Sequence, residues 1–323
     1  MSMTYKIEMT QTGGPEVLHR VDFEPRSPGA GEALVRQSAI GLNFIDTYFR
    51  TGLYPARMPF TPGQEGAGVV EAIGEGVTDI KVGDRVAYMG SGTYATHFTG
   101  PADRMLKLPE GVSEDEAAAT LLKGLTAWML LFEVHRASPG ETALIWAPVG
   151  GVGSIIVPWA ASLGVRVIGV TSTSEKAEMA KQSGAAEVIL SSEDVAARVR
   201  ELTDGKGVDV SYDSVGKTSA TASLDSLRRR GMYVSFGNAS GAVEPFSPAE
   251  LARRGSLFMT RPSLFDYIAD ADGLRRGAAA LFGVLGTGTV KADIGQTYPL
   301  DKAGEAQAAL EGRKTTGSTL LKP

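Results

Sequence analysis

The sequence TALIWAPVGGVGSIIVPWAASLGVRVIGVTS, residues 142–172, decides the fold of this chain. It begins with a short apolar run, and Gly150, Gly151 and Gly153 follow this run closely. An apolar helical segment comes next, and a second apolar run ends the stretch. Strand, glycine turn, helix and strand in this order predict one βαβ half of a dinucleotide-binding fold.

The glycine turn is suited to a pyrophosphate. Glycines have no Cβ, so backbone N–H groups near Gly151 and Val152 can approach an anion closely, and the helix behind them directs the positive end of its dipole toward it. A membrane-spanning helix is the alternative, because residues 142–165 carry no charge. Pro148, Pro158 and the glycines argue against a continuous spanning helix.

The end of the second predicted strand selects the cofactor. An NAD site places Asp or Glu there to bind the ribose 2′-hydroxyl, whereas an NADP site needs a cation and hydroxyl groups. Here Ser172 and Thr173 end the strand, and Lys176 follows one helical turn later. Glu175 is also near, but it should start the next helix with its side chain turned elsewhere. NADPH is therefore favoured over NADH, and the alternative is that Lys176 is a solvated lysine in a first helical turn.

Composition limits the class of protein. The chain of 323 residues is long enough for two domains, and its formal charge of −5 gives no basic field that would attract nucleic acid. It has no cysteine, which excludes disulfides, a cysteine nucleophile and thiolate metal ligands. The first residues lack a basic segment followed by an apolar one, so we expect a cytoplasmic protein with no secretion signal and no membrane association.

Residues 1–125 are predicted to be rich in β-structure. Short strand candidates separated by Gly and Pro suggest a compact barrel. A helix is predicted near 114–132, where Ser113 and Glu116 form a plausible capping box. The strand candidates are residues 5–9, 33–40, 68–73 and 83–88.

From residue 142 onward, strands and helices alternate, which predicts an α/β protein with a doubly wound parallel sheet of the Rossmann type. The strand ends 171–173, 213–216, 236–238 and 260–262 should line one carboxyl edge, where such sheets bind ligands. The other expected elements are strands at 187–190, 208–213, 232–236, 256–260 and 318–321, and helices at 194–202, 220–230, 272–285 and 301–311.

Five motifs in register point to a family. They are Ile40–Tyr48, Leu122–Thr126, Val149–Gly153, Tyr212–Gly216 and Ser235–Asn238. Together they resemble the zinc-free quinone oxidoreductases of the medium-chain dehydrogenase/reductase superfamily, the ζ-crystallin-like group. The resemblance covers essentially the whole chain, and five motifs are far more specific than one glycine loop.

This resemblance implies a domain organisation and an assembly. Residues 1–125 and 266–323 would form a GroES-like β-rich catalytic domain, and residues 126–265 a Rossmann domain inserted between them, with NADPH in the cleft. Members are commonly homodimers whose Rossmann sheets join edge to edge. The predicted strand Ser256–Thr260 is the candidate for that contact, because a long apolar edge needs covering.

A metal site is not expected. Zinc-dependent relatives use Cys and His ligands, and the positions near residues 40–46 and 63–65 offer neither. His19, His97 and His135 are scattered through the sequence. Glu65 could be a remnant of the zinc relatives' motif or simply a carboxylate in a turn.

Carried over by motif, the family's nucleotide contacts fall on both predicted domains. Ser191 is added because Leu190-Ser191-Ser192 stands where relatives often place a Tyr on the 2′-phosphate, and Ser191 could donate instead. Arg313 could equally be a surface cation at a helix end. The candidate NADPH-binding residues are Asn43, Phe44, Tyr48, Lys123, Thr126, Gly150, Gly151, Val152, Ser172, Thr173, Lys176, Ser191, Ser214, Phe236, Gly237, Asn238, Arg261 and Arg313.

The simplest chemistry for such a site is metal-free reduction of a small quinone, either by hydride from NADPH or by single electrons. Asn43, Tyr48 and Tyr54 are the candidate catalytic residues, and the two tyrosines could instead be packing residues. Reduction of 2-alkenals or enones is the close alternative. A non-catalytic NADPH-dependent RNA-binding or crystallin-type protein is the distant one, although Arg228–Arg230, the only basic run, is expected to mark an exposed helix end.

Overall fold

The computed structural model describes residues 4–323, and this part of the chain forms two compact units. The first unit comprises the residues up to Lys123 together with Leu274–Gly286 and Lys291–Pro323. The second comprises Gly124–Gly273 and Thr287–Val290. Both ends of the chain therefore contribute to the first unit, and the second is formed by the middle of the sequence.

The second unit contains a six-stranded, fully parallel sheet with the strand order β10-β9-β8-β11-β12-β13. The order reverses between β8 and β11, and this reversal is the switch point at which doubly wound sheets bind ligands. The predicted Rossmann sheet is thus confirmed. Its strands are β8 (Thr142–Trp146), β9 (Arg166–Thr171), β10 (Glu187–Leu190), β11 (Val208–Asp213), β12 (Leu227–Ser235) and β13 (Phe258–Thr260).

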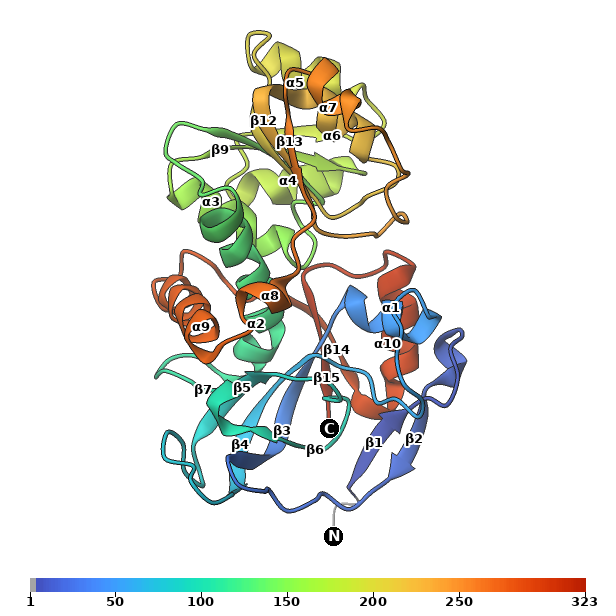
Figure 1. Cartoon of the computed structure of the whole chain (residues 1–323), viewed down its shortest axis with the longest axis vertical. Coiled ribbons are helices and arrows are strands. Elements are labelled where there is room, and N and C mark those ends of the chain that lie inside the picture. The colour runs from blue at the N-terminus through green and yellow to red at the C-terminus, as the bar shows by residue number, and fades with distance from the viewer. Residues whose placement is uncertain (1–3) are drawn as a thin grey trace. The chain divides into compact units, whose positions relative to one another are not determined.

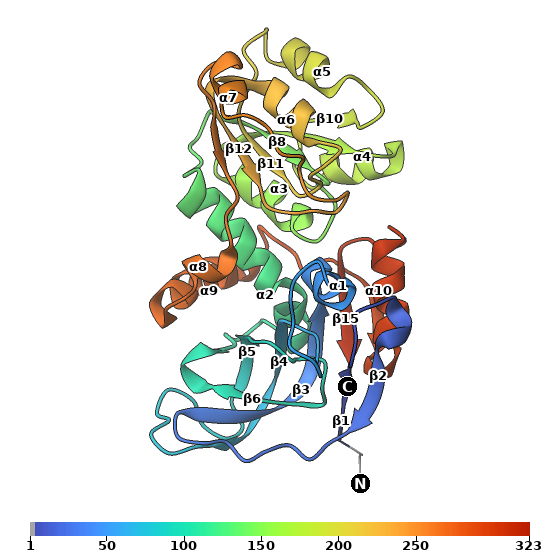
Figure 2. The ribbon, with the colours of Figure 1, turned by 45° about the vertical axis from the view of Figure 1, so that its right-hand side comes forward.

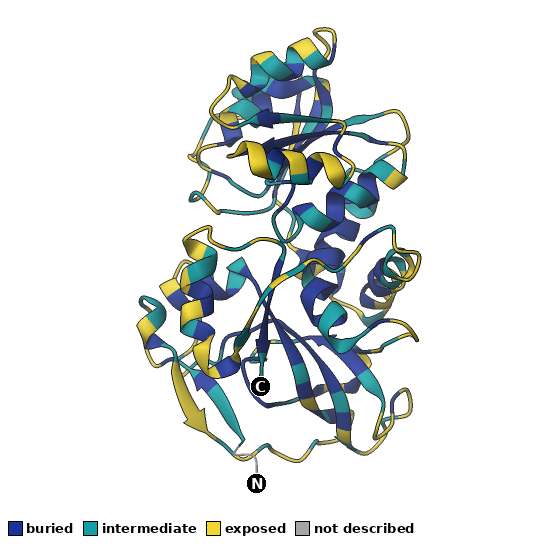
Figure 3. Cartoon of the chain, turned by 180° about the vertical axis from the view of Figure 1, so that it is seen from behind, coloured by how far each residue is buried: buried dark blue, intermediate teal, exposed yellow. Residues whose placement is uncertain are grey.

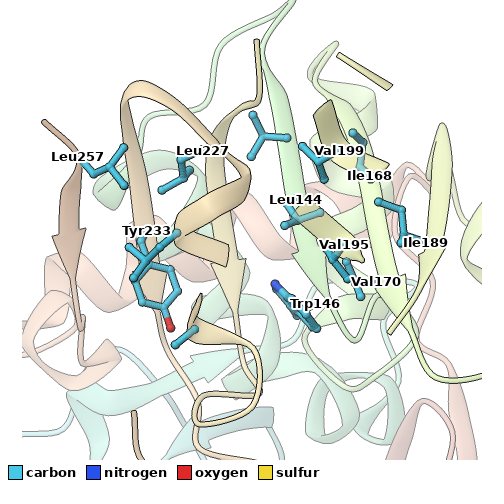
Figure 4. Packing of buried hydrophobic residues seen from close by; sticks show 13 residues of the cluster. Leu144, Trp146, Ile168, Val170, Ile189, Val195, Val199, Leu227, Tyr233 and Leu257 are labelled. Atoms are coloured by element: carbon cyan, nitrogen blue, oxygen red, sulfur yellow. The ribbon is translucent and has the colours of Figure 1, made fainter. Parts of the chain in front are cut away.

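Helices cover both faces of this sheet. Figure 2 shows α3 (Gly153–Ser162) and α4 (Ser174–Gln182) on one face, and α5 (Val195–Leu202) and α6 (Ala220–Ser226) on the other. Under α5 and α6 lies a continuous apolar core, in which Leu144, Val199 and Leu227 are buried (Figure 4). Two short helices, α7 (Ala249–Arg253) and α8 (Leu264–Tyr267), follow later in the chain. Burial of this face, rather than helix propensity alone, stabilises the unit.

The helix predicted at residues 220–230 is wrong at its C-terminal end. It stops at Ser226, and Arg228–Arg230 lie in β12 instead of at a helix terminus. Arg228 Nε donates to Asp209 Oδ1 on the neighbouring β11 at 2.5 Å. Arg230 has a positive φ of 57° where the β11–β12 register shifts, and it donates its N–H to Gly255 O. Long-range pairing with β11 therefore overrides the local helical pattern.

The first unit contains a seven-stranded sheet with the order β14-β15-β3-β4-β5-β7, and β6 also pairs with β3 (Figure 1). A separate pair, β1 and β2, completes its β-structure, and β2 is exposed throughout (Figure 3). The sequence did not predict β2, β6, β7 or β14. The strands are β1 (Tyr5–Glu8), β2 (His19–Asp22), β3 (Glu32–Leu42), β4 (Glu65–Ile73), β5 (Arg85–Met89), β6 (His97–Pro101), β7 (Met105–Lys107), β14 (Ile294–Pro299) and β15 (Ser318–Lys322).

The remaining helices include the one that positions much of the candidate site, α2 (Glu114–Trp128), which continues as a π-helical segment, η3 (Met129–Val134). The predicted capping box is confirmed, because Ser113 N donates to Glu116 Oε2 at 2.8 Å and Glu116 N donates to Ser113 Oγ at 3.2 Å. The other helices are α1 (Phe44–Thr51), α9 (Ala271–Gly286) and α10 (Ala303–Glu311), with short 3-10 turns η1 (Pro15–Val17), η2 (Ala102–Arg104) and η4 (Leu300–Lys302).

One helical stretch in the described chain, Glu114–Val134, is long and apolar enough to cross a membrane when judged by length and composition. Most of it is buried inside the protein. Core helices pass the same test, so this finding is weak evidence for a membrane span.

Candidate functional site

The glycine turn after β8 has the close backbone approach that the sequence predicts. A Cβ on Gly153 would lie 2.1 Å from Ala147 O, so no other residue fits there without moving the backbone. Gly150 donates its own N–H to Ala147 O at 3.0 Å. The N–H groups of Gly151 and Val152 have no acceptor among residues 4–323, and they stand at the start of the ten-residue helix α3. These two donors and the helix dipole form a site suited to a diphosphate.

Polar groups gather at the ends of the next two strands. Ser191 N donates to Thr171 O at 2.7 Å, so the ends of β9 and β10 lie side by side. The side chains of Ser172, Thr173 and Ser191 are exposed there. Thr173 caps α4 by accepting the Lys176 N–H at 3.3 Å. The half-buried Lys176 side chain forms no ion pair with any residue that the structure describes, which leaves its charge for a ligand phosphate.

The carboxyl end of β11 is organised by Asp213, which lies in the predicted strand end 213–216 but was not among the candidate site residues. Its fully buried carboxylate accepts hydrogen bonds from five groups on three elements. The donors are Val215 N (2.8 Å), Gly216 N (3.1 Å), Ser219 Oγ (2.7 Å), Ser223 Oγ (3.0 Å) and Tyr233 Oη (3.1 Å). Burial and the neighbouring Asp213 charge raise the pKa of Tyr233 well above its usual value, so Tyr233 stays a donor.

The neighbouring loops carry further candidate residues. Gly237 passes so close to Ser214 that a Cβ on it would lie 2.3 Å from Ser214 O. Arg261 Nη1 donates to Ser235 O at 3.2 Å. With its amide oxygen toward Arg261, Asn238 accepts a second bond from Arg261 Nη2 at 3.3 Å. The predicted residues at the ends of β8, β11 and β12 are therefore brought to one edge of the sheet.

In the first unit, a second buried carboxylate gathers candidate residues. Glu65 is fully buried, and its Oε1 accepts from Asn43 Nδ2 at 2.7 Å and from Lys123 Nζ at 3.3 Å. Its Oε2 accepts from Leu122 N on α2 at 2.6 Å. A Cβ on Gly41 would lie 2.2 Å from Glu65 Oε1, which explains the glycine in the Ile40–Tyr48 motif. The structure thus joins Asn43 and Lys123, two of the predicted residues, through one oxygen.

A third buried carboxylate lies next to this group. Asp46 Oδ2 accepts from Asn43 N at 2.9 Å and from Tyr94 Oη at 3.0 Å. Burial, together with a smaller contribution from the Glu65 charge, raises the pKa of Asp46 to about 7. Burial also holds the pKa of Tyr94 well above its usual value. Asp46 was not a predicted site residue, because its partner Tyr94 is distant in the sequence.

The predicted tyrosines lie in an aromatic cluster on and after α1. Tyr48 and Tyr54 meet edge to face with ring centroids 5.3 Å apart, and Phe44 is 6.5 Å from Tyr48. Both tyrosines are partly exposed. Thr126 is buried in the second unit, and Arg313 is exposed at the end of α10 in the first.

The residues do not fit a zinc ion. Within residues 4–323, no group of three or more His, Asp or Glu side chains is arranged to hold a metal. Around Glu65 the neighbouring groups are an amide N–H, a backbone N–H and an ammonium, all hydrogen-bond donors. Donors and a cation are the opposite of what a metal ion requires.

Comparison with known proteins assigns the class. A family model described as "Alcohol dehydrogenase GroES-like domain" matches residues 29–110, and one described as "Zinc-binding dehydrogenase" matches residues 151–268. A quinone oxidoreductase of Pseudomonas aeruginosa is 47% identical over 99% of this chain and 100% of its own length. A 2-haloacrylate reductase of Burkholderia sp. is 43% identical over 96% of each chain.

A solved structure extends this comparison to three dimensions. The quinone oxidoreductase of Escherichia coli, crystallised with NADPH, has a TM-score of 0.96 at 45% identity and covers 99% of this chain and 100% of its own. These matches define a two-domain class of dehydrogenases and reductases, the medium-chain dehydrogenase/reductase superfamily. Within it, the chain belongs to the quinone oxidoreductase group, as the five motifs predict.

Proposed function

We propose that this protein is an NADPH-dependent quinone oxidoreductase that works without a metal ion. The free N–H groups of Gly151 and Val152 at the start of α3 carry the proposal, in a chain similar along its whole length to quinone oxidoreductases. When bound, NADPH supplies the reducing equivalents to the quinone. The protein binds and orients the reactants and excludes water from them.

The chain's own residues divide this task by unit. In the second unit, the two N–H groups bind the diphosphate, and Lys176, Ser172 and Ser191 bind the 2′-phosphate. The remaining proposed contacts there are Thr126, Gly150, Thr173, Ser214, Phe236, Gly237, Asn238 and Arg261. In the first unit, Asn43, Phe44, Tyr48, Lys123 and Arg313 complete the proposed set. Asn43, Tyr48 and Tyr54 orient the acceptor, the two tyrosines through their hydroxyl groups.

Turnover tests the proposal directly. Purified protein is mixed with NADPH and 1,4-benzoquinone, and the loss of NADPH absorbance is followed. We expect saturable oxidation of NADPH by the quinone. If the protein binds NADPH but none of the acceptors tested leads to NADPH oxidation, the enzyme assignment is contradicted.

A second reaction has one observation in its favour, the 43% identity with a 2-haloacrylate reductase. Reduction of a conjugated C=C bond would use the same residues, so a 2-alkenal and a 2-haloacrylate are assayed beside the quinone. The acceptor with the higher kcat/KM is the better substrate class. RNA binding has no such support, since Arg228 is paired with Asp209. A binding titration between low and high salt would test it.

Lys176 decides between NADPH and NADH in this proposal. Lys176→Ala should raise the Kd for NADPH about 10- to 150-fold, the value of one charge-assisted hydrogen bond, and leave the Kd for NADH nearly unchanged. Lys181→Ala is the matched control, because Lys181 lies on the same helix and is exposed, with Glu178 3.2 Å away. Equal losses for the two nucleotides would contradict the role of Lys176.

We further propose that two copies join through β13. It is the edge strand of the parallel sheet, and it exposes 57% of Phe258 and 36% of Met259. Covering an apolar edge with a second copy removes its unpaired backbone groups from water. With three residues, β13 is shorter than the predicted strand 256–260. Phe258→Lys should convert the dimer to a monomer in light scattering, whereas a wild-type monomer would refute the contact.

Two further parts of the proposal follow from the family. Domain boundaries near residues 125 and 265 would make the first unit the catalytic domain and the second the NADPH-binding domain. We also propose that the protein works in the cytoplasm, where NADPH is supplied; fractionation of cells that produce it would test this.

A further inference from the structure

Glu65 is the one fully buried carboxylate that touches two of the proposed cofactor-binding side chains in the described part of the first unit. Its Oε1 accepts hydrogen bonds from both Asn43 Nδ2 and Lys123 Nζ, and its Oε2 accepts one from Leu122 N. These partners come from two places in the chain, the start of α1 and the middle of α2. A single carboxylate therefore sets the position of both side chains.

We propose that Glu65 is a positioning residue for cofactor binding: it fixes Asn43 and Lys123 for the nicotinamide half of NADPH. The proposed function leaves that half to them, because it assigns the diphosphate and the 2′-phosphate to residues of the second unit. The inference rests on the proposed function and adds a residue to it. Glu65 itself touches no reactant. It acts through the two side chains that it holds.

The chemistry of the carboxylate explains why no other residue serves here. Three donors converge on Glu65, and an ionised carboxylate is the only side chain of this length that offers acceptors alone. It orients the Asn43 amide, because the nitrogen must face Glu65 and the carbonyl oxygen must face away. It also supplies the countercharge that a buried ammonium needs, since Lys123 is 5% exposed.

The surrounding backbone is arranged to admit this carboxylate. At Gly41, a Cβ would lie 2.2 Å from Glu65 Oε1 and 2.3 Å from Ala118 O. The Asn43 backbone is held from the other side, where its N–H donates to Asp46 Oδ2. Asn43 is thus fixed at its backbone by one carboxylate and at its amide by another. Such double restraint is what a precisely oriented binding group requires.

The bond to Lys123 leaves that side chain able to act on a ligand. An ammonium group has three N–H donors, and Glu65 Oε1 uses one of them. At 3.3 Å the contact is longer than the 2.7 Å bond from Asn43. The contact therefore holds Lys123 in place, while the side chain retains donors for hydroxyl or phosphate oxygens.

Glu65→Gln tests this role, with Glu71→Gln as the matched control on the same strand, where the carboxylate is exposed. The glutamine turns an N–H₂ group toward donors and removes the countercharge, with little change of size. Kd is measured for NADPH and for adenosine 2′,5′-bisphosphate, a fragment that lacks the nicotinamide half. We expect Glu65→Gln to raise the Kd for NADPH about 10- to 100-fold and to change that of the fragment less than about twofold.

A structural role alone would give a different pattern. Equal losses for NADPH and the fragment, or no loss for either, would overturn the inference. If Glu65→Gln does not fold, Glu65→Asp is used instead, because it keeps the charge but withdraws it by one methylene. It should raise the Kd for NADPH about 3- to 10-fold and again leave the Kd for the fragment unchanged. Failure of the proposed function looks different, because wild-type protein would then bind no NADPH or reduce no quinone with it.

Discussion

Replacement of Asp213 by alanine should strongly destabilise the second unit. The carboxylate accepts from two backbone N–H groups, those of Val215 and Gly216, and from three hydroxyl groups. Ser219 can redirect its hydroxyl to Gly216 O, which lies 3.1 Å away. The other four donors lose this acceptor: those of Gly216, Ser223 and Tyr233 in buried surroundings, and Val215 N in partly buried ones.

The size of the effect follows from this count. A buried donor left without a partner costs about 1 kcal/mol at the lower end of the usual range, so four of them cost about 4 kcal/mol. This is a large part of the stability of a typical domain, about 5–15 kcal/mol. Asp213→Asn keeps the oxygen that serves the backbone, while its amide nitrogen faces hydroxyls that can rotate, so it should cost about 2 kcal/mol. Tyr233→Phe removes one of five donors and should cost about 1 kcal/mol.

Urea unfolding followed by tryptophan fluorescence measures these values with a probe that lies in the second unit. The three tryptophans of the chain, Trp128, Trp146 and Trp159, all lie in the range Gly124–Gly273. The urea midpoint should be highest for Tyr233→Phe, lower for Asp213→Asn and lowest for Asp213→Ala, and the slopes of the transitions should be unchanged. If Asp213→Ala cost no more than Tyr233→Phe, the carboxylate would not organise this loop and the reasoning would be refuted.

Two further predictions concern the first unit. Burial raises the pKa of Asp46 to about 7, so between about pH 4 and 7 the folded state keeps a proton on Asp46 that the unfolded state releases. The free energy of unfolding should therefore fall by up to about 4 kcal/mol as the pH rises from about 4 through 7. Asp46→Asn should abolish that part of the decline in urea midpoints followed by circular dichroism, and a variant with the wild-type decline would rule it out. Arg50 is buried at 1% exposure with its Nη2 2.7 Å from both Glu311 oxygens, so Glu311→Ala should cost about 3 kcal/mol by leaving the guanidinium unpaired. A loss below about 1 kcal/mol in the same assay would show that the ion pair contributes little.

The glycine turn and the parallel strands were predictable because their signals are local. Gly153 follows a strand and starts a helix within a few residues, so the sequence alone indicates a close backbone approach at that point. The strands β8 to β11 are short apolar runs between turns. The first two lie within residues 142–172 as predicted, and β10 and β11 have their predicted ranges. In β14, by contrast, partly buried and exposed residues alternate as in a strand, but the segment contains Gly295 and Pro299, which are residue types that strands disfavour. Its composition therefore gives little strand signal.

The helix predicted through Arg230 failed for a different reason. The local residues allow a helix, but Arg228 pairs with Asp209 on the adjacent strand. Lys123 and Glu65 are likewise 58 positions apart, and no local pattern couples them. The sequence left Glu65 as a remnant or a turn carboxylate, while the fold makes it a shared acceptor. Tertiary pairing of this kind is decided only when distant strands and helices meet.

Each unit therefore contains a fully buried carboxylate behind its proposed cofactor-binding residues, Glu65 in the first and Asp213 in the second. The two differ in what they hold, and this difference separates stability from function. Asp213 holds backbone N–H groups and hydroxyls of its own unit, so its loss should appear mainly as lower unfolding free energy. Glu65 holds two side chains proposed to bind NADPH, so its loss should appear first as weaker binding of the intact cofactor. If Glu65→Gln lowered stability as much as Asp213→Ala while NADPH affinity stayed the same, Glu65 would be a structural residue like Asp213, and Asn43 and Lys123 would need another explanation for their convergence on one oxygen.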